Sequence, residues 1–542
     1  MVSWYHPGQL ILTALDVLAS KVVGGKLDPR LVEALVANSN AHYDYSQNEG
    51  DFWFDYIADT GDGWNSTYHV AYTAAQPELE LIQDEKAHRT VRGQVLVFGG
   101  DMVYPVPSNR AYQERLVEPY RCALKSTKPI GDVFALPGNH DWYDGLVAFA
   151  RLFCSTTSNY LGRSFGAWQT RQRRSYFALK LPRGWWLAAT DLQLCSDIDT
   201  PQLDYFRDIA KQMSPKDRVI LCHAEPHWIY AKAYGRYNPE FSEHNLCFLE
   251  EKVFGHRIAI FLAGDLHHYR RHATDAGKQK ITAGGGGAFL HPTHGLRVGS
   301  VGNGYKLRMA YPPPSVSHRL AYGNLFFVFK NPFFGILPAT LYSLTAWSMK
   351  PQIGHLPWKE IGKALDSTWA AFYASPFTAF WVLSILIGMV VFTETHSKIY
   401  RWTAGPLHGI AHLIALFFLG WGAAQFAHSI ASPSAQLAAL GAIIFGGGWI
   451  VGSVLMGIYL LISLNLFGRH TEDAFAALRI EDWKSFLRFK INAEGELTLF
   501  PIGIRRVARR WKKAPAESCS VYMPDDPLAG PPELIESPIR VS

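Results

Sequence analysis

The sequence predicts an α/β domain followed by an all-α membrane domain. Between Phe52 and Lys330, short apolar runs typical of strands alternate with polar stretches typical of helices. Beyond Lys330 the composition shifts to long uncharged apolar runs. We therefore expect the α/β domain to cover residues 49–330 and the membrane domain to cover residues 331–467.

The bulk properties narrow the class of protein. A net charge of +6 is small for 542 residues and argues against a nucleic-acid-binding protein. The cysteines show no paired or metal-type spacing, which fits a reducing compartment. The N-terminus lacks a basic region followed by an apolar core, so we expect no cleavable signal. We predict that residues 1–48 form short amphipathic helices, one of them starting near Asp28.

Polar side chains stand at the ends of five apolar, strand-like runs in the α/β region. The ends of these runs read Asp59-Thr60-Gly61, Gly100-Asp101-Met102-Val103-Tyr104, Gly138-Asn139-His140-Asp141, Cys222-His223 and Gly264-Asp265-Leu266-His267-His268. Open α/β sheets place ligands at the carboxyl ends of their strands. A sheet that presents these residues together builds a site of oxygen and imidazole ligands, suited to manganese, iron or zinc.

The order D-x-G, GD-x-x-Y, GNHD, H and G-x-x-H resembles the calcineurin-like metallophosphoesterases, and Gly61 and Tyr104 make it most similar to the purple-acid-phosphatase branch. The resemblance spans roughly residues 52–330, and the ordered set is much more specific than any single motif. It implies a β-sandwich flanked by helices. It also implies two bound metal ions, manganese or iron first and zinc as an option, and hydrolysis of a phosphate ester by a metal-bound hydroxide.

The same resemblance assigns roles to individual residues. Asp59, Asp101, Tyr104 and His267 would hold the first ion, and Asn139, His223 and Asp265 would hold the second, with Asp101 as the bridge. His140 would protonate the leaving oxygen or stabilise its charge, and Asp141 would orient His140.

Position 265 departs from the family pattern, which usually has GHxH where this chain has Gly264-Asp265-Leu266-His267. Asp265 either ligates through oxygen, which favours manganese or iron, or weakens the second metal site. We prefer His223 over the nearby His227 as a ligand because His223 stands at the strand end.

Four further residues are candidates for contact with the substrate. They are His227, His268, Arg171 and Arg174. Arginine forks suit phosphate oxygens, although a solvated basic face is the simpler explanation of Arg171 and Arg174. We read the glycine run 284–287 as a wall of the site, because glycine lets a backbone approach closely.

The membrane domain is predicted to hold about four helices. Residues 377–393, 407–430 and 437–467 carry no charge, and residues 332–349 form a shorter, proline-interrupted candidate. Lys398, Arg401 and Arg469 place their loops in the cytoplasm by the positive-inside rule. We expect an integral membrane protein, of a bacterial inner membrane, whose catalytic domain and C-terminus are cytoplasmic. His408 and His412 share one helix face, where they are either functional or hydrogen-bonded between helices.

The region after residue 467 is predicted to be soluble again. Residues 468–513 contain a β-hairpin around Gly495, followed by a basic cluster from Arg505 to Lys513 that either attracts anionic lipid or is simply solvated. Residues 514–542 are proline-rich and polar, which predicts disorder.

Three functions remain open from the sequence. The first is a membrane-anchored phosphoesterase acting on a phospholipid or lipid-linked phosphate, with membrane lipids as partners. The second is a phosphodiesterase for a soluble cyclic nucleotide, with the helices as anchor or sensor. The third is a non-catalytic module that binds lipid or a partner on a phosphoesterase fold.

Overall fold

The computed structural model describes residues 1–24, 42–83, 85–126, 128–154, 164–192, 197–235, 244–349, 353–393 and 396–541. The chain forms two compact units. The first comprises Met1–Val2, Leu12–Ser317 and Arg479–Ser542, and the second comprises Ser3–Ile11 and His318–Leu478. Near the N-terminus the structure has α1 (Pro7–Gly24). The predicted helix start at Asp28 lies outside the described residues.

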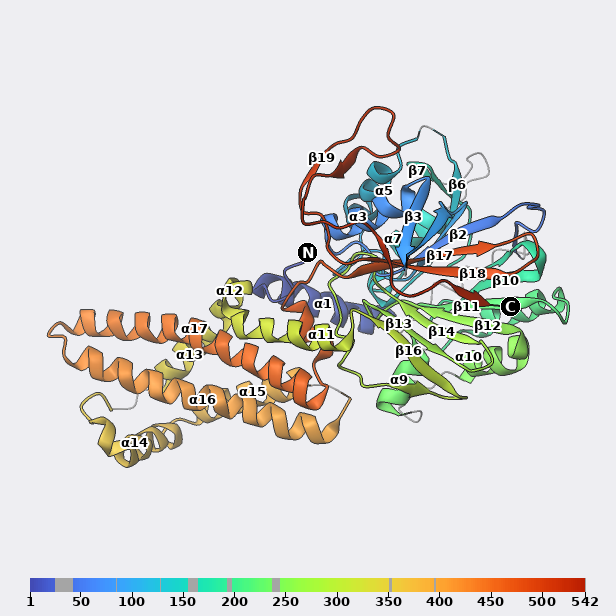
Figure 1. The fold of residues 1–542 in the computed structure, drawn as a ribbon. Helices are drawn as coiled ribbons and strands as arrows, with labels where there is room; N and C mark the ends of the chain where they lie inside the picture. The colour runs from blue at the N-terminus through green and yellow to red at the C-terminus, as the bar shows by residue number, and fades with distance from the viewer. Residues whose placement is uncertain are drawn as a thin grey trace. The chain divides into compact units, whose positions relative to one another are not determined.

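The first unit is built on two large sheets (Figure 1). In spatial order, one sheet contains β1 (Tyr43–Asp44), β9 (Phe177–Lys180), β10 (Trp185–Ala189), β11 (Arg218–His223), β12 (Ile258–Ala263), β14 (Gln279–Ala283), β13 (Tyr269–Ala273), β16 (Tyr305–Tyr311) and β15 (Ser300–Val301). The other contains β21 (Glu533–Leu534), β18 (Leu497–Ile504), β17 (Lys484–Ile491), β2 (Phe52–Ile57), β5 (Val95–Gly99), β6 (Gly131–Leu136), β8 (Trp168–Thr170) and β7 (Ser164–Phe165), and β22 (Ile539–Val541) pairs with β18. Two small hairpins are separate, β3 (Glu78–Gln83) with β4 (Lys86–Val91) and β19 (Trp511–Lys513) with β20 (Tyr522–Pro524).

The alternation of side chains in β2 explains how the two sheets pack. Phe54 and Tyr56 point into a core shared with strands of the other sheet. Phe54 also stacks on Phe489 of the adjacent strand β17, at 4.4 Å between ring centroids. Trp53 and Ile57 point the opposite way and pack against helices. Since both faces are covered, β2 reads as an almost continuous apolar run. The unit is therefore an α/β sandwich with helices on its outer faces, as the sequence predicts.

Helices of the first unit cover the sheets or carry strand-end residues. They are α3 (Trp64–Ala75), α4 (Asn109–Tyr112), α5 (Glu118–Ala123), α6 (Asn139–Trp142), α7 (Val147–Phe149), α8 (Thr200–Lys211), α9 (His227–Tyr234) and α10 (His244–Phe248), and α11 (Pro314–Ala321) begins in this unit.

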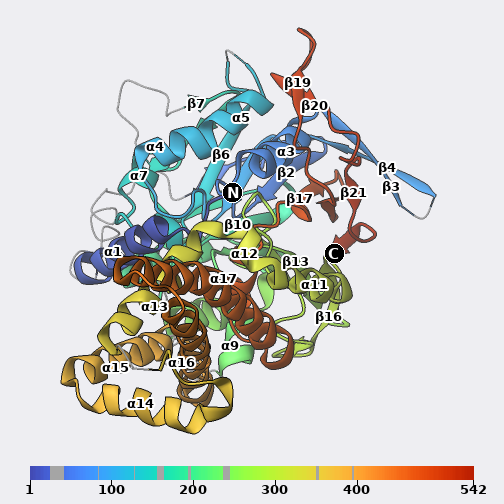
Figure 2. The same ribbon diagram turned by 90° about the vertical axis from the view of Figure 1, so that its left-hand side faces the viewer.

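The C-terminal region belongs to the first unit, which differs from the predicted separate hairpin and disordered tail. The hairpin of β17 and β18 does form, but β17 also pairs antiparallel with β2, and residues beyond 513 supply β20, β21 and β22. Figure 2 shows β17 beside β2 from a second direction. The apolar faces of these strands complete the sandwich core, so the tail gains order from burial and not from its own composition. The basic cluster is also neutralised in part, because Arg505, Arg509 and Lys512 form ion pairs with acidic residues of the same unit.

The second unit is helical. Its helices are α12 (Phe327–Lys330), α13 (Ile336–Met349), α14 (Ile361–Tyr373), α15 (Pro376–Phe392), α16 (Lys398–His428), α17 (Pro433–Phe467) and α18 (Thr471–Ala476). Among the described residues, α16 and α17 are each long and apolar enough to cross a membrane, and the number rises to four if each of two bent helix pairs counts as one span. Alone, α13 is about 21 Å long and α15 about 26 Å, short of a hydrocarbon core of about 30 Å.

The return of the chain to the first unit limits the number of crossings. The chain leaves that unit after Ser317 and rejoins it at Arg479, where β17 pairs with a strand from the N-terminal half. Both segments must lie on the same side of any membrane that the helices cross. The number of crossings is therefore even, which two or four spans satisfy.

Buried polar side chains link the long helices. His412 contacts Tyr342 of α13 through Nδ1 at 2.9 Å and His408 through Nε2 at 3.1 Å. His408 stacks on Tyr459 of α17 at 4.0 Å, and the Tyr459 hydroxyl lies 2.9 Å from His470 Nε2. These contacts fit the interhelical hydrogen-bonding role that we weighed for His408 and His412.

A buried histidine makes the first unit sensitive to acid. His69 of α3 accepts a hydrogen bond from the Ala508 amide at 3.0 Å, and burial lowers its pKa to about 4. The neutral imidazole is the folded form, so stability is complete above the ordinary pKa of 6.5 and falls between pH 6.5 and 4, by about 3 kcal/mol at most. We expect His69→Gln, which keeps an acceptor, to flatten this part of the curve of unfolding free energy against pH. The exposed control His256→Gln should leave the slope unchanged, and equal slopes in all three proteins would contradict the prediction.

Candidate metal centre

Three aspartates stand where strands end, and all three have unusual backbone conformations. Asp59 follows β2, Asp101 follows β5 and Asp265 follows β12, with φ angles of 60°, 51° and 68°. Residues other than glycine seldom adopt positive φ, and the cost is of order 1–2 kcal/mol each. Because the paired strands β2 and β5 are parallel, their carboxyl ends meet at one edge of the sheet. Strained acidic residues gathered at strand ends are typical of a functional site.

Three of the predicted ligands meet around the hydroxyl of a fourth, Tyr104. Its oxygen lies 3.1 Å from Asp59 Oδ1 and 3.1 Å from Asp101 Oδ2. It also lies 2.8 Å from His267 Nε2. These are the four residues that the resemblance assigns to the first ion, and the fold brings them together from the ends of β2, β5 and β12.

The orientation of His267 suits a metal ligand. Its Nδ1 lies 2.7 Å from the carbonyl oxygen of Phe289, which accepts the Nδ1 proton and leaves the Nε2 lone pair directed toward Tyr104. His291 stacks on the His267 ring at 3.7 Å and holds its plane. The stacking of His291 on His267 was not predicted, because the residues around a loop histidine do not indicate which ring it contacts.

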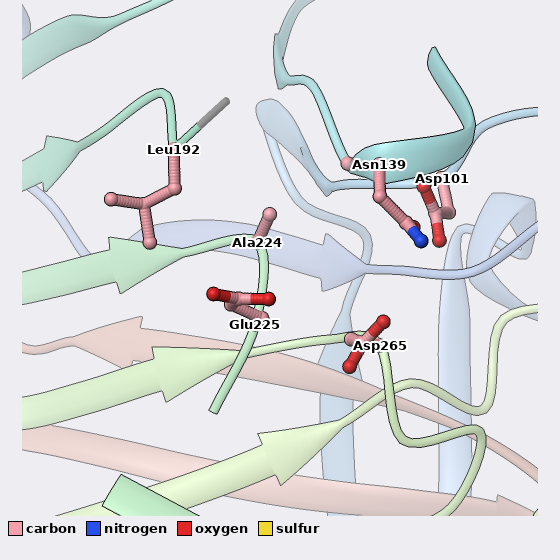
Figure 3. A pocket seen from close by; sticks show the side chains of 7 residues that line it. Asp101, Asn139, Leu192, Ala224, Glu225 and Asp265 are labelled. Atoms are coloured by element: carbon pink, nitrogen blue, oxygen red, sulfur yellow. The ribbon is translucent and has the colours of Figure 1, made fainter. Parts of the chain in front are cut away.

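A pocket opens beside this cluster. It is lined by Asp101, Gly138, Asn139, Leu192, Ala224, Glu225 and Asp265. Figure 3 shows Asn139 and Asp101 reaching in from one side and Asp265 and Glu225 from the other. Asn139 and Asp265, predicted at the second ion, therefore share the pocket with Asp101. Glu225 is an acidic lining residue that the sequence did not suggest, although its position two residues after the end of β11 is a signal of the same kind.

The site gathers carboxyl groups away from water. Burial, followed by the charge of Asp265, raises the pKa of Asp101 to about 8. Burial and the charges of Asp101 and Asp265 raise the pKa of Asp59 well above its usual range. Carboxylates in such a site ionise together only when a cation compensates them. The donor set of carboxylate, phenol, amide and imidazole groups fits manganese or iron.

His140 and Asp141 occupy positions that differ from their predicted relation. His140 Nδ1 bonds to the carbonyl oxygen of Pro105 at 2.7 Å, so Pro105 has the orienting role that was expected of Asp141. Asp141 instead accepts hydrogen bonds from the Gly138 amide at 2.9 Å and the Met102 amide at 3.3 Å. It thereby fixes the two loops that follow β5 and β6. Burial lowers the pKa of His140 to about 4, so the imidazole is neutral at pH 7.

His223 and His227 lie with a glutamate, and neither is among the residues that line the pocket. His223 Nδ1 faces the Thr190 hydroxyl at 2.8 Å, and its Nε2 lies 3.4 Å from Glu250 Oε1. His227 Nε2 lies 2.8 Å from the same oxygen. We predicted His223 at the second ion and His227 at the substrate. Both imidazoles instead face Glu250 of the π-helical turn Leu249–Phe254.

The remaining substrate candidates also have other partners. Arg171 forms an ion pair with Asp132 at 2.7 Å, and Arg174 lies over the rings of Tyr176 and Tyr205. Asp132 is near the start of β6, about 13 Å along the strand from its pocket end, so Arg171 is far from the site. His268 is only 1% exposed and is not among the lining residues.

Close glycine packing holds Asp59 in place. A Cβ atom at Gly284 would lie 2.3 Å from Asp59 Oδ2, which supports the reading of the glycine run as a wall of the site. We expect Gly284→Ala to displace the Asp59 carboxylate and to weaken metal binding at least tenfold, measured by metal titration followed by elemental analysis. Gly302→Ala is the control, because its Cβ would meet nothing within 4 Å. Equal metal affinity in the two variants would contradict the prediction.

Comparisons with known proteins give no closer assignment. No protein-family model matches the chain, and no curated protein matches its sequence. GAP50, described as the anchor in the inner membrane complex of Plasmodium, aligns at 13% identity and a TM-score of 0.31, over 47% of this chain and 77% of its own. Purple acid phosphatase PPD1 from yellow lupin (Lupinus luteus) aligns at 11% and 0.28, over 45% and 46%, and PhoD at 8% and 0.28, over 45% and 59%. Likenesses of this size assign neither a family nor an activity.

Proposed function

We propose that the protein is a membrane-associated, two-metal phosphoesterase. The observation that carries the proposal is the gathering of Asp59, Asp101, His267 and Tyr104 within hydrogen-bonding distance, beside an acidic pocket. A pair of bound divalent or trivalent ions would lower the pKa of a coordinated water and neutralise phosphoryl oxygens.

Each ion would have its own set of ligands, with one residue shared. Asp59, Tyr104 and His267 form one half of the site and Asn139, Asp265 and Glu225 the other, with Asp101 between them. The second half would then be bound entirely through oxygen, which favours manganese or iron over zinc. His223 remains a candidate only if its ring turns away from Glu250.

Asp141 and His140 would orient the reacting groups. Asp141 holds the loops that present Asp101 and Asn139, since it binds the amides of Met102 and Gly138. His140 is our candidate for the contact with the leaving oxygen. Its Nδ1 proton is held by Pro105, so Nε2 is the nitrogen that would face the substrate.

We infer a substrate that resides in the membrane, a phospholipid or a lipid-linked phosphate or pyrophosphate. The reason is the insertion of a helical unit, with two to four potential spans, into the chain of the α/β unit. A soluble cyclic nucleotide is the enzymatic alternative. A non-catalytic module that binds lipid or a partner is the alternative of another class, and the departure at Asp265 is the feature that favours it. We further propose that the α/β unit faces the cytoplasm.

The proposal is tested on the full chain in detergent, stripped with a chelator and reloaded with manganese, iron or zinc. Hydrolysis of aryl phosphate mono- and diesters should require metal. Phospholipids in mixed micelles are then compared with cyclic nucleotides. Preference for the nucleotides removes the lipid substrate, and binding of metal without any hydrolysis supports the non-catalytic module.

A further inference from the structure

His223, His227 and Glu250 form a group of metal-binding side chains apart from the pocket residues, with both histidines buried and Glu250 partly buried. One ligand atom from each lies within 4.8 Å of the other two. The three residues come from different elements: the end of β11, the first residue of α9 and the π-helical turn Leu249–Phe254. From this geometry we propose a third cation site, of the zinc class, that shares no ligand with the pocket residues.

The spacing of the donor atoms matches a compact metal site. Zinc binds nitrogen and oxygen ligands at about 2.0–2.1 Å, which places tetrahedral ligand atoms about 3.3 Å apart. Glu250 Oε1 lies 3.4 Å from His223 Nε2 and 2.8 Å from His227 Nε2. Two imidazoles and one carboxylate are a ligand set that zinc uses in proteins.

The Nδ1 hydrogen bond of His223 leaves its Nε2 lone pair available to bind a cation. The Thr190 hydroxyl donates to the Cys222 carbonyl at 3.3 Å, so its oxygen accepts the Nδ1 proton of His223 at 2.8 Å. The Nε2 lone pair then faces a carboxylate oxygen, and neither His223 Nε2 nor Glu250 Oε1 has a hydrogen bond of good geometry. His223 is completely buried. A metal ion between the two acceptors removes their repulsion, and Thr190 holds the ring in the orientation that a ligand needs.

The position of the site gives it a structural role. The segment from His223 to His227 contains Glu225, which lines the acidic pocket. A cation bound at both ends of this segment would fix its conformation and the place of the Glu225 carboxylate. The alternative is an ordinary ion pair between a protonated His227 and Glu250.

Zinc content of the full chain in detergent separates these possibilities. Glu250→Gln is compared with Glu251→Gln, an exposed neighbour of the same type. We expect wild type and Glu251→Gln to hold one more zinc ion per chain than Glu250→Gln, after equal loading and removal of excess zinc. Equal zinc content in the two variants overturns the proposal and leaves the ion pair.

A second measurement does not depend on the folding of Glu250→Gln. The Asp101→Asn chain should retain one zinc ion, whose X-ray absorption spectrum shows imidazole scattering and a nitrogen and oxygen shell at about 2.0–2.1 Å. A zinc-free Asp101→Asn chain, or a spectrum without imidazole, overturns the third site. If Asp101→Asn binds as much metal as wild type, the two-ion pocket fails while Glu250→Gln still decides the third site.

Discussion

Asp101→Asn is expected to reduce metal-dependent phosphoester hydrolysis by about a thousandfold or more. In the proposed site Asp101 is shared by both halves, since its Oδ2 lies 3.1 Å from the Tyr104 hydroxyl and it lines the pocket with Asn139 and Asp265. Loss of the proposed bridging carboxylate would remove several kcal/mol of transition-state stabilisation. The amide has nearly the same shape, so the measurement reports charge and coordination more than packing.

Two controls separate lost chemistry from lost folding. Asp275→Asn alters a carboxylate that is 75% exposed and pairs with Lys306 and Arg308, and it should keep full activity. In chelator, Asp101→Asn should unfold at a temperature no lower than wild type, because one of several repelling buried carboxyl groups is gone. Wild-type activity in Asp101→Asn would contradict the two-metal proposal outright.

Arg488→Met is expected to destabilise the first unit by about 3–5 kcal/mol. Arg488 of β17 lies opposite Asp55 of β2, and their side chains form two hydrogen bonds at 2.7 and 2.9 Å. Both are buried, with exposures of 0% and 1%. Removal of one partner leaves an uncompensated buried charge. Chemical unfolding of the detergent-solubilised chain, followed by tryptophan fluorescence, measures the loss.

The double variant Arg488→Met/Asp55→Leu tests the cause. It should recover most of the lost stability, because an apolar pair of similar size replaces the ion pair without a stranded charge. Arg540→Met is the surface control, since Arg540 is 76% exposed and should change stability by less than about 1 kcal/mol. A double variant as unstable as Arg488→Met alone would show that the other contacts of Arg488, to Thr90 and Ala74, dominate.

Part of the site was predictable because ligands lie at the carboxyl ends of strands in open α/β sheets. Asp59 and Asp101 follow neighbouring parallel strands of one sheet, and such strands bring their ends together by geometry alone. His267 follows β12 of the other sheet, so its place beside them depends on how the two sheets pack. Glu250 escaped prediction because it lies in a helical stretch, where glutamate is common. The places of His223 and His227 depend on that glutamate, so their contacts were not predictable from strand order.

The partner of the C-terminal hairpin was the main gap in the predicted fold. Alternating side chains predict strands but not which edge they join. One partial signal was available: Asp55 is the only charge in the apolar strand β2, and a charge in a core needs an opposite partner. The sequence does not identify that partner, because Arg488 is one of three basic residues in β17.

The place of β17 and β18 in the sheet also sets an order of events during synthesis. These strands leave the ribosome only after α13 to α17 have been made. Until then the edge of β2 that pairs with β17 is open, and this unpaired edge can aggregate or bind chaperones. A chain that ends before Arg479 lacks β17 and β18 and therefore has an incomplete sheet. A version without the helical unit must therefore join residues 1–317 to residues 479–541.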